Sequence, residues 1–176
     1  MAQPSPAAYS GPQALPFSFR RLALQWAPPL VWMALILIAS NDWLSAQETE
    51  GWLRRILVAL FGPIPAMKLK LLHILARKAG HFFSYAVLAW LSYRSARASL
   101  QEATPPNAAW RFRAALYGLG FSLVTASLDE AHQAFTNLRS GTFADVLLDM
   151  SGALAALALI WFASKRKLRA AERSQS

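Results

Sequence analysis

The chain has 176 residues, of which 55% are hydrophobic and only 15% are charged. This charged share is well below the roughly 25% of an ordinary soluble domain, so the composition favours a membrane protein. The formal net charge is +9, but the basic residues flank apolar runs and form no single stripe, which favours membrane flanks over a nucleic-acid surface. The absence of cysteine excludes disulfides, thiolate chemistry and a cysteine-ligated zinc site.

The first part of the chain combines a polar tail with an apolar run. Residues 1–19 are rich in Pro, Ser, Ala and Gly and contain no charged side chain, so we expect a disordered tail. The apolar run over residues 22–39 follows two arginines and predicts a first transmembrane helix, in which Pro28 and Pro29 mark the first turn or a kink. A signal peptide is the alternative, but the long preceding tail and the later apolar runs favour a membrane span.

The connecting segment 45–65 places apolar residues at helical spacing, Trp52 and Ile56 among them, with charged residues in between. This pattern predicts a short amphipathic helix that lies on the membrane surface or on the bundle. Gly62 and Pro63 are expected to end it.

A second long helix is expected over residues 67–94. Its uninterrupted apolar part, residues 82–93, has only 12 residues, whereas a transmembrane helix needs about 20. The helix must therefore include Arg77, Lys78 and His81 in order to cross the bilayer. These groups would lie at or just inside the membrane interface.

Two further apolar runs, 112–128 and 143–163, complete the pattern, and a short loop over residues 136–142 joins them. We therefore predict an all-α fold, a four-helix transmembrane bundle with a short amphipathic helix between helices 1 and 2. The predicted organisation is the N-terminal tail, a transmembrane domain over 20–164 and a basic cytoplasmic tail over 165–176.

The distribution of basic residues predicts the orientation. If the N-terminus is inside, the cytoplasmic segments hold eleven basic residues and the outer segments hold seven. Because Lys and Arg are enriched on the cytoplasmic side of membrane proteins, both termini are expected in the cytoplasm.

Acidic residues are concentrated where a membrane protein should have few. Asp129, Glu130, Asp145 and Asp149 are four of the nine acidic residues, and they flank the loop between the third and fourth apolar runs. Ionisable groups in or beside a span are costly, so such a cluster is a hypothesis for a functional site. Because alternate helices reverse direction, His81 is expected at the same membrane face.

Helical spacing sorts the candidate side chains into stripes. The three stripes are Lys78, His81 and Tyr85; Asp129, His132 and Gln133; and Asp145, Asp149 and Gly152. Glu130 points about 100° away from Asp129. Gly152 and Ala153 are small and would let the fourth helix approach a neighbour closely.

Three chemical uses fit these stripes. A carboxylate near His132 or His81 could act as a general base in apolar surroundings. Arg139, Lys78 and Arg77 could hold a phosphate or carboxylate of a lipid headgroup. Histidine and carboxylate ligands could also bind Zn or Mn, although no tight ligand spacing supports this use.

The structural alternative is a network of ion pairs that joins the helices. Arg139 could pair with Asp145, and Lys78 with Asp129. In this interpretation Glu130 simply faces water.

Three sequence blocks resemble those of the VanZ-like membrane protein family. They are RKAGHFFSYAVLAWL (77–91), DEAHQAF (129–135) and RSGTFADVLLDMSGA (139–153). The blocks hold the family's Lys-x-x-His-Phe-x-x-Tyr element, its Asp-Glu-x-x-Gln-x-Phe element, and an Arg followed by two spaced Asp and a Gly. The resemblance implies a small multi-helix bacterial membrane protein from a family linked to glycopeptide (teicoplanin) resistance.

The leading hypothesis is an integral protein of the bacterial inner membrane with a polar pocket that faces outward. The pocket is expected to bind a membrane lipid or a lipid-linked envelope precursor, and in an enzymatic version to modify it. The alternative is a non-catalytic binding or scaffold protein, and a proton-coupled transporter is disfavoured because four short helices leave little room for alternating access. No nucleic-acid partner is expected, and the sequence specifies neither a cofactor nor an oligomeric state.

The enzymatic version assigns roles to the site residues. Asp129 or Glu130 is the general base or nucleophile, and His132 and His81 assist proton transfer. The substrate-binding set is Lys78, Tyr85, Gln133, Arg139, Asp145 and Asp149; within it the cations hold an anionic substrate, and the two aspartates orient those cations or bind a metal.

Overall fold

The computed structural model describes residues 19–40, 46–100, 110–135 and 143–174. Within these ranges the chain forms five α-helices and no strand. The helices are α1 (Phe19–Ala39), α2 (Ala46–Phe61), α3 (Ala66–Ser99), α4 (Phe112–Phe135) and α5 (Phe143–Arg173). The all-α prediction is confirmed. The predicted N-terminal tail lies outside the described residues, except for Phe19.

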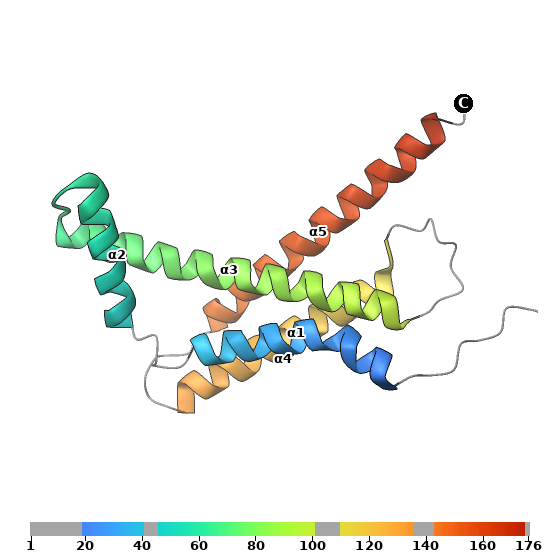
Figure 1. Ribbon diagram of the computed structural model, residues 1–176, viewed down its shortest axis with the longest axis horizontal. Helices are drawn as coiled ribbons and strands as arrows, with labels where there is room; N and C mark the ends of the chain where they lie inside the picture. Colours follow the sequence, from blue (N-terminus) through green and yellow to red (C-terminus); the bar gives the residue numbers. More distant parts are fainter. Residues whose placement is uncertain (1–18, 41–45, 101–109, 136–142, 175–176) are drawn as a thin grey trace, which may run out of the picture.

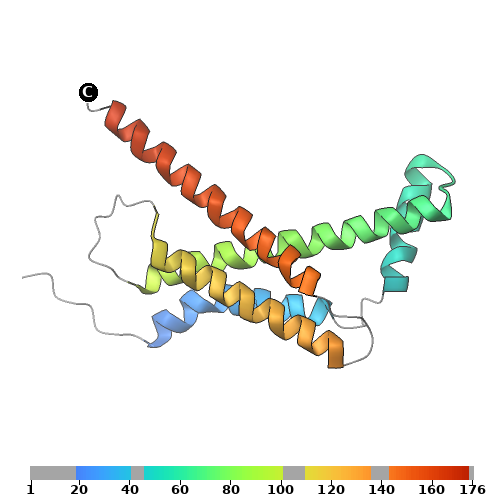
Figure 2. The same cartoon turned by 180° about the vertical axis from the view of Figure 1, so that it is seen from behind.

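Helix α3 is the centre of the molecule, since it contacts each of the other four helices. In Figures 1 and 2, α1 and α4 run opposite to α3, whereas α5 runs in the same general direction and diverges toward its C-terminus. The C-terminal ends of α1 and α4 therefore lie at the same end as the start of α5. We call this the polar end of the bundle.

The two consecutive prolines lie inside α1, well after its start at Phe19, so they mark a bend and not the first turn (Figure 1). Pro29 has no N–H to donate to the carbonyl of Gln25, four residues earlier. Ser95 of α3 donates its hydroxyl to that carbonyl at 2.6 Å. The proline break in α1 thus creates a hydrogen bond that attaches α1 to α3.

Helix α5 approaches the backbone of α3 at Gly152. A methyl group added to this glycine would overlap the carbonyl of Phe82. The next residue, Ala153, is fully buried. The prediction of a close approach at these small residues is confirmed, and Gly118 of α4 makes a similar contact with the carbonyl of Ala89.

In the described part of the chain, two helices, α1 and α5, are long and apolar enough to cross a membrane. A third candidate arises if α2 and α3 are counted together, although they are bent by 117° at the break between them. Gly62, with a φ of 77°, begins this break. Helix α4 has 24 residues and is long enough, but it is not among these apolar candidates, so the four-span bundle stays a prediction.

Two helices are longer than predicted. Helix α3 continues from the predicted end at residue 94 to Ser99, and α5 continues past residue 163 to Arg173. The described part of the basic C-terminal segment is therefore a continuation of α5. Lys and Arg near a helix C-terminus favour this extension because they interact well with the helix dipole.

The contact at Gly152 makes a testable prediction. Replacing Gly152 with Ala should destabilise the protein by about 1–3 kcal/mol, because the new methyl group must push α5 away from α3. The measurement is thermal unfolding of purified protein in detergent. Gly120→Ala in α4 is the control, since its methyl group would meet no described atom within 4 Å; equal stability of the two variants would contradict the prediction.

Candidate functional site

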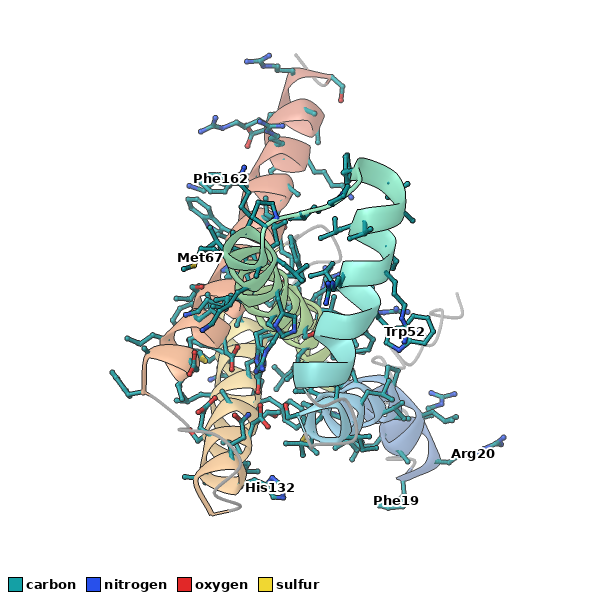
Figure 3. The ribbon with its side chains drawn as sticks, turned by 90° about the vertical axis from the view of Figure 1, so that its left-hand side faces the viewer. Phe19, Arg20, Trp52, Met67, His132 and Phe162 are labelled. Carbon is teal, nitrogen blue, oxygen red and sulfur yellow. The ribbon has the colours of Figure 1, made fainter. Side chains whose placement is uncertain are left out.

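Buried polar side chains from α3, α4 and α5 gather at the polar end. Tyr85 and Asp149 are fully buried, and Asp129 is only 1% exposed. Glu130 and Gln133 are also buried. Figure 3 views the molecule from this end, with α2 in front of the bundle. We call this group of residues, together with His81, the polar cluster.

A histidine and a carboxylate form the link between α3 and α5. His81 Nδ1 lies 3.3 Å from Asp149 Oδ1, and the His81 side chain is 24% exposed whereas that of Asp149 is fully buried. Asp149 precedes Gly152 by one helical turn, and His81 directly precedes Phe82. The close helix contact at Gly152 therefore brings the carboxylate to the imidazole.

The Tyr85 side chain extends the cluster one turn further along α3. It follows His81 by four residues and so lies on the same face of the helix. The carboxylates of Asp149, Asp129 and Glu130 all interact electrostatically with it. Among the described residues, the buried Tyr85 hydroxyl has no hydrogen-bond partner.

Asp129 connects α4 to the end of α1. The Ser40 hydroxyl donates a hydrogen bond of 2.9 Å to Asp129 Oδ2. The other carboxylate oxygen, Oδ1, is buried and has no hydrogen-bond partner in the described part of the chain. Sequence reasoning missed Ser40; its only signal was a polar residue at the end of the first apolar run, at the same membrane face.

The cations are arranged differently from the prediction. Lys78 is exposed, whereas the preceding Arg77 is half-buried and interacts electrostatically with His81. Arg77 and His81 are four residues apart, which places both on the stripe that leads to Tyr85. Arg139 lies outside the described residues, so its predicted pairing with Asp145 stays untested.

The remaining predicted residues differ in burial. His132 is exposed at the C-terminal end of α4 (Figure 3), whereas Gln133 beside it is buried. Asp145 is half-buried and interacts electrostatically with Asp149. The interpretation in which Glu130 faces water is wrong, because this side chain is only 9% exposed.

The geometry allows proton transfer at one accessible group. If Asp149 accepts the Nδ1 proton of His81, the imidazole is held in the tautomer whose Nε2 can accept a proton. Asp149 would then position His81, and would not orient a cation as the sequence suggested. Within the ranges that the structure describes, no group of three or more His, Asp or Glu side chains is placed to hold a metal ion.

Comparison with known proteins identifies one match. A family model described as VanZ/LLP1 matches residues 26–164, a range that contains every residue of the polar cluster. No curated protein and no solved structure matches the chain.

The contact between His81 and Asp149 can be tested with a double-mutant cycle. The effects of His81→Gln and Asp149→Asn on unfolding should be non-additive by about 0.5–3 kcal/mol, because each substitution removes the partner of the other residue. Unfolding in detergent provides the measurement. The same cycle with the exposed His132→Gln and Asp149→Asn should be additive, and additivity in both cycles would contradict the contact.

Proposed function

The chain belongs to the VanZ/LLP1 family, and on this premise we propose that its polar cluster binds a lipid-linked or headgroup-bearing molecule of the bacterial cell envelope. The family's link to glycopeptide resistance favours an envelope molecule at the outer face of the inner membrane. The proposal includes four membrane spans, with both termini in the cytoplasm and the polar cluster opening outward.

The observation that carries this proposal is the set of buried polar atoms without partners. Among the described residues, the Tyr85 hydroxyl, Asp149 Oδ2 and Asp129 Oδ1 are buried and have no hydrogen-bond partner. Each such atom costs about 1–3 kcal/mol, so native proteins rarely keep several together without a reason. A ligand that supplies the missing hydrogen bonds is such a reason, and the three atoms come from three different helices.

The charges of the cluster define the chemistry of this ligand. Carboxylates accept hydrogen bonds, so Asp129 and Asp149 suit a headgroup with hydroxyl or amide donors. Arg77, which interacts with His81 at the edge of the cluster, suits an anionic phosphate. Sugar or amino-acid groups attached to a lipid phosphate combine both features.

In the enzymatic version of the proposal, His81 is the general base. Its side chain is partly exposed, so a bound hydroxyl could reach Nε2, while Asp149 holds the opposite nitrogen. Tyr85 would then donate a hydrogen bond to the bound headgroup. Asp129, which accepts a bond from Ser40, serves binding in this arrangement and is no longer the leading candidate for the base.

A second candidate function is a non-catalytic scaffold, and the pairwise contacts favour it. Ser40 with Asp129, and His81 with Asp149, each join two segments of the bundle. In that case the polar groups stabilise the helix arrangement and bind nothing. The two functions differ in what they require of the Tyr85 hydroxyl, which has no hydrogen-bond partner among the described residues.

Replacing Tyr85 with Phe separates the two functions. The substitution removes no hydrogen bond to a described residue, so stability should change by less than about 1 kcal/mol. Glycopeptide susceptibility of cells that express the variant should nevertheless return to that of cells without the protein. Tyr117→Phe, at an exposed tyrosine of α4, should keep the wild-type phenotype. A full phenotype in Tyr85→Phe would favour the scaffold.

The four-span topology can be tested with single cysteines, because the chain contains none. We expect a cysteine at Gly51 to react with an impermeant thiol reagent from outside intact cells. Cysteines at Ala98 and Ser174 should react only after the membrane is opened. In the four-span topology α3 returns the chain to the cytoplasmic side, and α4 and α5 then cross outward and back again. Reaction of position 98 from outside would show that α3 does not cross the membrane and would contradict the four-span topology.

A further inference from the structure

A second candidate site lies at α2, away from the polar cluster. Helix α2 and the turn that follows it enclose a recess of about 700 Å³. Its lining residues are Gly51, Arg54, Arg55, Val58, Ala59, Pro63 and Ile64. None of these residues belongs to the polar cluster, so this site is independent of the proposed function.

The orientation of α2 places the recess at the membrane surface. Helix α2 bends by 117° from α3 and crosses the end of the bundle (Figures 1 and 3). If the long helices span the bilayer, α2 lies roughly parallel to its plane. Trp52, Ile56, Leu60 and Phe61 are exposed on it, as expected for an amphipathic helix that sits among lipid headgroups.

The charged side chains that line the recess are both basic. Residues 51–80 contain six basic side chains and no acidic one. Arg54 and Arg55 are exposed at the recess, and the Arg55 guanidinium lies 5.3 Å from the centre of the Trp52 ring. Guanidinium groups bind phosphate oxygens in a bidentate manner, and no carboxylate is among the residues that line the recess.

The apolar part of the lining defines the rest of the ligand. Val58, Ala59, Pro63 and Ile64 line the recess together with the two arginines. A free phosphate would leave this surface unused, whereas a phospholipid would cover it with the first part of its acyl chains. We propose that the recess binds the phosphate of an anionic membrane lipid, held by Arg54 and Arg55.

Lipid binding by the full-length protein tests this site. The protein in neutral detergent is titrated with phosphatidylglycerol or phosphatidylcholine, and bound lipid is counted by native mass spectrometry. The wild-type protein should retain phosphatidylglycerol in preference to phosphatidylcholine. The double variant Arg54→Gln/Arg55→Gln should bind it roughly tenfold more weakly or worse, because each arginine near a lipid phosphate contributes to affinity.

A second variant removes space and keeps the charge. Gly51→Leu should fill the recess and weaken binding to a similar degree, and a Cβ at this position meets no described atom within 4 Å, so the variant should fold. Gly80→Leu is the matched control, because Gly80 has equally open surroundings but does not line the recess. Arg166→Gln/Arg169→Gln is the charge-matched control for the arginine pair, and both controls should keep the preference.

Three results would overturn the proposal. The first is equal retention of the two lipids by the wild-type protein, and the second is unchanged phosphatidylglycerol binding in both Gly51→Leu and the arginine double variant. The third is displacement of the lipid by millimolar inorganic phosphate, which would show that the site binds a free anion. Because no polar-cluster residue is altered, none of these results bears on the role of Tyr85.

Discussion

The close contact between Gly152 and the carbonyl of Phe82 is the constraint on which the site depends. A side chain at position 152 would hold α5 away from α3, and Asp149 would lose its position beside His81. The same pair of helices carries Tyr85 into the buried space between them. The absence of a side chain at Gly152 therefore allows both the close packing of α5 on α3 and the contact between Asp149 and His81.

The polar cluster illustrates how a membrane protein can keep an unfavourable arrangement. Burying carboxylates with few donors is costly, and the large apolar surfaces of the long helices must supply the stability that offsets this cost. Some of the cost is removed locally, as when Ser40 donates to Asp129. The atoms without partners among the described residues are those to which the proposed function assigns a ligand, and they distinguish that proposal from a purely structural network.

The two halves of helix α3 lie in different surroundings. Its C-terminal part lies within the bundle, where Tyr85, Leu88 and Ala89 are fully buried. Its N-terminal part lies next to α2 and exposes Met67 and Leu71. The buried part positions the polar cluster, and the exposed part follows the turn that lines the recess at α2. Four of the six Lys and Arg residues of α3 lie in this N-terminal part: Lys68, Lys70, Arg77 and Lys78.

The sequence by itself determined the helices, the amphipathic segment and the end of the bundle at which the polar residues meet. Periodicity and alternating helix direction are enough for these, because both depend only on residue spacing. Only the tertiary structure decided that Asp149 lies beside His81, that Arg77 is half-buried and interacts with His81 while Lys78 is exposed, and that Glu130 is buried. Residue spacing shows which side chains share one face of a helix. It does not show which neighbouring helix that face contacts, because this depends on where two helices can pack closely. Here the close contact at Gly152 brings the face of α5 that carries Asp149 against α3.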